Sequence, residues 1–102
     1  MGSVGAGRSS RNVTAGINIT EGMTIPELNT VAEQLANRAL ELQRERDGRF
    51  AQLSADVSAG RITVDEAVRQ NAAVIDDYNR RLEELRALNR RMTTLYNISV
   101  SI

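Results

Sequence analysis

The chain has 102 residues, a quarter of them charged, and 13 arginines balance 13 acidic residues to a formal net charge of zero. This length allows one domain, and zero net charge supplies no overall field that would draw the chain to nucleic acid or a membrane. Cysteine and histidine are both missing from the sequence. Disulfides, thiol nucleophiles, the commonest general base and the usual zinc ligands are therefore excluded, and we expect a non-enzymatic protein without cofactor or metal.

Residues 1–11 are small, polar and rich in glycine. Such a composition cannot bury enough apolar surface to order itself, so it predicts a flexible or partner-bound N-terminal arm. The sequence offers neither the apolar block of a secretory signal nor a run of about 20 apolar residues that could span a bilayer. We expect a virion or cytoplasmic protein that does not contact a membrane.

Residues 12–23 are predicted to form a short strand and a turn, because residues 12–20 alternate between polar and apolar side chains around Ile17 and Ile19. Period-two alternation predicts a short strand, in which Gly16 would form a bulge or bend. A turn at Glu21 and Gly22 would then lead into the first helix.

The first helix is predicted to begin after Thr24 and to cover about residues 25–59. Thr24 and Glu27 have the spacing of a capping box, in which each side chain binds a backbone N–H of the other residue. Pro26 falls in the first turn, where its missing N–H costs nothing. Gly48 interrupts a charged stretch of this helix. We expect the helix to continue through Gly48, and a break there is the alternative.

Residues 58–66 are predicted to join two helices in a tight turn. Gly60 suits the left-handed position just beyond a helix end. Thr63 and Glu66 repeat the capping-box spacing at the start of the second helix. The sequence therefore predicts a helical hairpin that folds back at Gly60.

The second helix is predicted over about residues 64–95 and carries three parallel rows of apolar residues. This apolar face is wider than one partner helix can cover, so it predicts an oligomer interface. The residues that we expect there are Val74, Ile75, Tyr78, Leu82, Leu85 and Leu88. Asn71 lies among them, and either a buried role in fixing register or a wet position at the edge of the seam fits its place.

Residues 97–102 alternate again and predict a second strand, with Ile98, Val100 and Ile102 on one face. The hairpin would return this strand to the level of Ile17 and Ile19. Two short strands are marginal by themselves, so we expect both ends to form a small sheet with strands from other subunits.

Charged residues occur as adjacent pairs on the second helix. Neighbouring positions on a helix point in different directions, and each basic pair has acidic residues one turn away. Self-compensated ion pairs are therefore favoured over a catalytic carboxylate pair or a specific nucleic-acid site. The pairs are Asp76 and Asp77, Arg80 and Arg81, Glu83 and Glu84, and Arg90 and Arg91.

Together these patterns predict a mainly α fold: a long, coiled-coil-like antiparallel hairpin over residues 24–96 with short β-strands at its ends, forming a trimer or larger homo-oligomer. The function expected is that of a structural subunit of a large assembly, most concretely a neck, tail, fibre or decoration protein of a phage or virus. The alternatives are an adaptor or chaperone that binds a partner helix, and a subunit of a bacterial secretion system or appendage.

Overall fold

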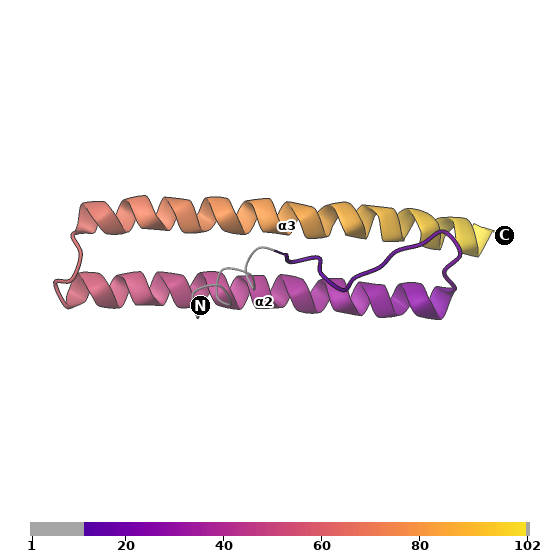
Figure 1. Ribbon diagram of the computed structural model, residues 1–102, viewed down its shortest axis with the longest axis horizontal. Coiled ribbons are helices and arrows are strands. Elements are labelled where there is room, and N and C mark those ends of the chain that lie inside the picture. The colour runs from indigo at the N-terminus through magenta and orange to yellow at the C-terminus, as the bar shows by residue number, and fades with distance from the viewer. Residues whose placement is uncertain (1–11, 102) are drawn as a thin grey trace, which may run out of the picture.

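The hairpin predicted from the sequence is confirmed. The computed structural model describes residues 12–101, in which α2 (Ile25–Ser58) and α3 (Val64–Ser101) lie antiparallel and side by side (Figure 1). The predicted arm, residues 1–11, and the final residue lie outside the described part of the chain. At 1.5 Å per residue, each helix is roughly 50 Å long or slightly more.

The start of α2 is fixed by local hydrogen bonds. The Glu27 carboxylate accepts from the Thr24 backbone N–H at 2.8 Å, and the Thr24 hydroxyl accepts from the Glu27 N–H at 3.3 Å. Both halves of the capping box are thus present, with Pro26 in the first turn. The helix then runs without a break through Gly48 to Ser58.

The turn after α2 closes with two backbone hydrogen bonds that satisfy the last free carbonyls. The Gly60 N–H donates to the Val57 carbonyl and the Arg61 N–H to the Asp56 carbonyl, at 3.0 and 2.8 Å. Gly60 has φ 77°, so this is the Schellman arrangement with glycine in the left-handed position.

The cap of α3 is simpler than the sequence predicts. The Thr63 hydroxyl accepts from the Glu66 N–H at 3.1 Å, as expected. The Glu66 carboxylate, however, binds the side chains of Arg69 and Gln70. Only one half of the predicted capping box forms here, because these side chains one turn along the helix take the carboxylate oxygens.

Residues 12–20 do not form the predicted strand. Their backbone bonds are local: the Ala15 N–H donates to the Asn12 carbonyl and the Ile17 N–H to the Thr14 carbonyl, both at 3.1 Å. Gly16 adopts φ 80° within this turn. The segment then runs back between the two helices toward the start of α2 (Figure 1). Its apolar residues are buried against helices instead of pairing in a sheet.

The second predicted strand is also replaced. Residues 97–101 continue α3, and no strand is present within residues 12–101. Each residue added to an existing helix gains a backbone hydrogen bond without a new nucleus, whereas a strand here would have no partner. The Ser101 hydroxyl donates to the Asn97 carbonyl at 2.7 Å, which adds a further bond at this end.

Candidate interaction surfaces

The hairpin has two long faces with different contents. We call the side on which residues 12–23 lie the covered face, and the opposite side the open face. Along α2, Val31 and Arg38 are on the covered side and Ala32 and Ala39 are on the open side. Because side chains three, four and seven residues apart share a helix face, these positions assign most of the remaining residues to one side or the other.

The covered face is closed by apolar side chains of the N-terminal segment. Val13, Ile17 and Ile19 are all buried and belong to one core cluster with residues of both helices. Their partners in that cluster are Leu28, Val31, Leu35, Leu42, Leu85 and Met92. The segment therefore serves as a third layer of the core over the half of the hairpin farthest from the turn.

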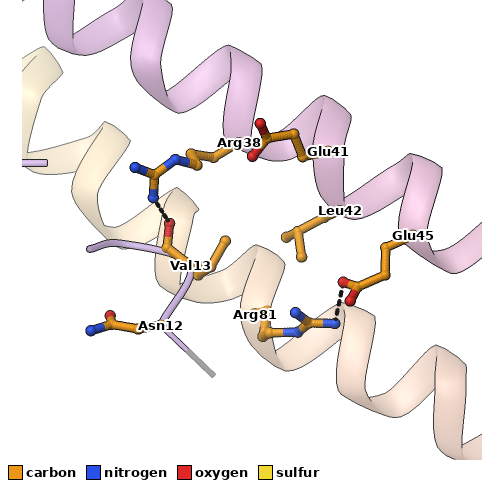
Figure 2. Close-up of a pocket in the computed structure, with 7 residues that line it drawn as sticks. All are labelled: Asn12, Val13, Arg38, Glu41, Leu42, Glu45 and Arg81. Carbon is orange, nitrogen blue, oxygen red and sulfur yellow. Dashed lines mark hydrogen bonds and ion pairs between the residues drawn. The ribbon is translucent and has the colours of Figure 1, made fainter. Parts of the chain in front are cut away.

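Arg38 holds the segment by its main chain. One guanidinium nitrogen of Arg38 donates to the Val13 carbonyl at 2.7 Å (Figure 2). The other donates to the Ala15 carbonyl, also at 2.7 Å. A charged donor makes these bonds stronger than those between neutral groups. Gly16 follows directly, and a Cβ there would lie 3.8 Å from the same guanidinium. The left-handed turn at Gly16 thus forms beside the residue that anchors the segment.

A polar pocket adjoins this anchor at the middle of the covered face. Arg81 of α3 is only 7% exposed and donates to Glu45 of α2 at 2.8 Å and to Asp77 at 2.7 Å. Figure 2 shows Arg38 and Arg81 entering the pocket from different helices, with Leu42 between them. Arg81 binds carboxylates of both helices, and Arg38 binds the main chain of the N-terminal segment. These bonds fix the register of the two helices and the position of the segment.

The half of the covered face nearest the turn is polar and contains two carboxylates, of Asp56 and Glu66, whose pKa values are lowered. Hydrogen bonds from Arg61 and then Gln52 hold the pKa of Asp56 below its usual value of 3.8. Hydrogen bonds from Gln70 and Arg69 likewise lower the pKa of Glu66 from 4.5. Both carboxylates are stabilised as anions, which suits ion pairing and disfavours a role as a general base near neutral pH.

The open face carries exposed apolar side chains along its turn half. Val64, Val68 and Ile75 are 64, 60 and 46% exposed. Leu82 is seven residues beyond Ile75, on the same line of α3, and is half-buried. These residues form a row of apolar side chains along one line of α3, which we call the apolar ridge and which no described part of the chain covers.

Two shallow hollows mark the other half of the open face, which we call the terminal half. The first lies between Ala36 and Ala39 of α2 and Leu82 and Arg86 of α3. The second lies between Ala32 of α2 and Met92, Thr93 and Tyr96 of α3. The small alanine side chains leave this space, and within residues 12–101 Arg86 is the sole charged residue lining either hollow.

The sequence-predicted interface residues separate into three groups. Val74 and Leu85 are buried inside the hairpin, as Ile17 and Ile19 are beneath the segment. Ile75 is exposed, and Tyr78, Leu82 and Leu88 are half-buried. Among the predicted strand residues, Ile98 and Val100 are exposed on the last turns of α3, and Ile102 lies outside the described residues.

Three features of these faces escaped the sequence analysis. Arg38 contacts residues 23 and 25 positions away, and no local pattern indicates such a contact. The alanine-lined hollows depend on how the two helices pack, which the sequence patterns do not indicate. Val68 is seven residues before Ile75, yet it is not among the interface residues predicted from the sequence.

Both roles considered for Asn71 remain predictions. Its residue is half-buried, and its Oδ1 is fully buried without a hydrogen-bond partner among the described residues. An unsatisfied buried acceptor costs about 1–3 kcal/mol. At the boundary between the core and the open face, Asn71 is therefore unfavourable unless water or another group binds this acceptor.

No family model, curated protein or solved structure matched the chain in our comparisons. Neither α2 nor α3, as far as the structure describes them, contains a stretch long and apolar enough to cross a membrane. Residues 12–101 also contain no group of three or more acidic side chains placed to hold a metal ion. The open and covered faces are therefore the features from which a function is argued.

Proposed function

We propose that the protein is a non-enzymatic structural subunit that self-associates through its open face. The observation that carries this proposal is the apolar ridge of Val64, Val68 and Ile75, which stays exposed after the chain has covered the other face with its own N-terminal segment. Contiguous apolar surface of this kind on a folded protein is typical of an interaction site.

The open face is large enough for a stable pair. Two adjacent helices roughly 50 Å long, with axes 8–10 Å apart, present a surface on the order of 1,000 Å². Stable protein interfaces bury about 800 Å² on each partner. One open face packed against another therefore exceeds this requirement even if the helix ends remain exposed.

The distribution of charge also favours association through the open face. Among the described residues, one charged side chain, that of Arg86, lines its hollows, whereas pockets on the covered face include Arg38, Glu45, Arg49 and Asp56. The centre of a protein interface is depleted of charged side chains. The hollows could therefore be buried against a copy of the chain together with few charged side chains.

Association through one self-complementary face yields a dimer, and a larger assembly needs a second contact. Ile98, exposed near the end of α3 and pointing away from the open face, is a candidate for it. A component of a phage or virus particle, such as a neck, tail, fibre or decoration protein, is the setting that we propose for such a subunit. The trimer or larger order expected from the sequence belongs to the same proposal.

The test uses a matched pair of substitutions in the full-length chain. Ile75→Glu places a charge on the open face, and Ile98→Glu places the same charge on the far side of α3, at a similarly exposed position. Light scattering at micromolar concentration should give a multimer for the parent chain and a monomer for Ile75→Glu. Ile98→Glu should retain the dimer. A monomeric parent chain would refute the proposal.

The second candidate function is a helical adaptor that binds a partner helix. The same exposed ridge favours it, since an amphipathic partner helix could pack its apolar face against these side chains. An adaptor would be monomeric alone and would gain mass only with its partner. The light-scattering measurement of the parent chain therefore distinguishes the two functions directly.

A further inference from the structure

Two exposed side chains on the turn half of the open face project as knobs. Val68 and Ile75 are both more than two-fifths exposed and are separated by seven residues of α3. Seven residues of helix correspond to about 10.5 Å. The knobs therefore form a spaced pair on one line of the helix.

Two hollows on the terminal half have a similar spacing. They have volumes of about 240 and 210 Å³, and each is bordered by alanine on α2. A cavity of about 150 Å³ accommodates a benzene molecule, so each hollow has room for an aliphatic side chain. Arg86 borders the first hollow and Thr93 the second, and these residues are also seven positions apart.

One symmetry operation brings both knobs to both hollows. A two-fold axis that crosses α3 at right angles between Arg80 and Arg81 exchanges the level of Ile75 with that of Arg86. The same axis exchanges the level of Val68 with that of Thr93. In an isologous interface each contact occurs twice, so a single arrangement fills four hollows with four knobs.

We infer that the open face binds a second copy of this chain in the antiparallel orientation, with Ile75 in the hollow bordered by Ala36 and Arg86, and Val68 in the hollow bordered by Ala32 and Thr93. This inference rests on the proposed self-association and adds its geometry. The pair forms a four-helix arrangement of two stacked hairpins, in which the turn of each hairpin lies over the free helix ends of the other.

The parallel two-fold arrangement lacks this fit. An axis along the helices would bring turn half against turn half and terminal half against terminal half. The hollows of one copy would then face the hollows of the other, and the side chains lining the empty volume would lose packing contacts. Ile75 would lie near Phe50 of the other copy, because Glu45 of α2 is level with Arg81 of α3 and the helices run in opposite directions.

Cysteine cross-linking distinguishes these orientations because the chain contains no cysteine of its own. Full-length Ile75→Cys protein is mixed with full-length Arg86→Cys protein and oxidised, so that any mixed disulfide joins two chains. We expect a cross-linked mixed dimer. Ile75→Cys mixed with Phe50→Cys is the matched control for the parallel orientation and should remain mostly uncross-linked.

The outcomes separate the failure of this inference from the failure of the proposed function. Cross-linking of the Ile75 and Phe50 positions in place of the Ile75 and Arg86 positions would overturn the antiparallel pair while leaving self-association intact. A dimer by light scattering that cross-links at neither pair would also overturn it. A monomeric parent chain would remove the proposed function itself.

A packing exchange provides a second test that needs no disulfide geometry. Ala36→Leu fills the first hollow and should weaken the dimer by about tenfold, since overpacking of this kind typically costs 1–3 kcal/mol. Adding Ile75→Ala in the same chain shortens the knob and should restore most of the affinity. Additive weakening by the two substitutions, measured by sedimentation over a concentration series, would contradict contact between them.

Discussion

The covered and open faces belong to the same two helices, yet they differ in how their apolar residues are shielded. On the covered face, Val13, Ile17 and Ile19 are brought back from the N-terminal side and anchored by Arg38. On the open face, Val68 and Ile75 remain exposed beside hollows lined by alanine. Two helices bury apolar residues only where they meet. Apolar residues outside this seam must be covered by another segment of the chain or by another molecule.

The difference also lies in the polar groups. Contacts on the covered face include ion pairs and bonds to main-chain oxygens, which demand exact positions and suit a permanent intramolecular contact. The open face offers mainly shape and apolar area. Changes on the two faces should therefore affect different properties: the free energy of unfolding on the covered face and the dissociation constant on the open face.

The largest effect is expected where the core meets the covered segment. Leu28 is completely buried and packs in the same cluster as Ile17 and Ile19. Leu28→Ala should lower the free energy of unfolding by about 2–5 kcal/mol through lost burial and the cavity that remains. Urea denaturation followed by circular dichroism measures this loss. A loss below 1 kcal/mol would contradict a core that includes the N-terminal segment.

Removing the Arg38 anchor should affect the covered face alone. Arg38→Ala deletes two charge-assisted hydrogen bonds and should cost about 2 kcal/mol. Amide exchange of residues 13–19 should accelerate, while the dissociation constant of the multimer stays within about twofold. Arg38→Lys, which cannot bind both carbonyls in the same planar geometry, should give an intermediate exchange rate. If Arg38→Ala weakened self-association as much as it lowered the free energy of unfolding, the two faces would not act separately.

Substitutions in the turn should lower the stability of the whole hairpin, because the turn connects the two helices that form both faces. Gly60→Val introduces a β-branched residue at φ 77° and should destabilise the hairpin by about 1–2 kcal/mol. Thr63→Ala removes the hydroxyl that caps α3 and should cost about 1 kcal/mol. Thermal melting detects both losses. An unchanged melting temperature combined with lost association would instead make the turn part of the interface.

Lowering the pH should produce the smallest effect. It should lower the free energy of unfolding before it changes the dissociation constant of the multimer. The pKa values of Asp56 and Glu66 are lowered by folding. Their contribution is therefore complete above the unfolded values of 3.8 and 4.5 and is lost as the pH falls through the lower folded values. Urea midpoints between pH 6 and 3 should decline below about pH 4.5, and Asp56→Asn should flatten that decline. The opposite slope would contradict the assigned hydrogen bonds.

Local sequence signals predicted the parts of the fold that are determined locally. Thr24 with Glu27, and Gly60 beyond α2, mark helix ends through contacts within a few residues. The predicted strands failed because alternation was interpreted without knowing the partner. Ile17 and Ile19 alternate because the segment lies in a groove between helices, and Ile98 belongs to a helix that simply continues. Partner identity depends on tertiary packing, which a pattern of this length does not encode.

The candidate interface was predicted only in part for a related reason. The sequence indicated that the apolar face of the second helix exceeds one seam, and Ile75 is exposed as this implies. It could not indicate which rows the hairpin itself would bury, so Val74 and Leu85 were assigned to an interface although they lie within the hairpin. Arg38, which anchors the covering segment, binds residues more than 20 positions away, so no local pattern indicates this contact.

The Arg38 anchor has a consequence for how the N-terminal segment can change in evolution. Every amino acid carries the carbonyl oxygen that Arg38 binds at positions 13 and 15, so these bonds place no demand on side-chain identity. Ala15 and Asn18 are exposed and should accept most substitutions. Gly16, with its positive φ, and the buried Ile17 and Ile19 should not. The segment can therefore drift at its exposed positions, and acquire new surface chemistry there, without being released from the hairpin.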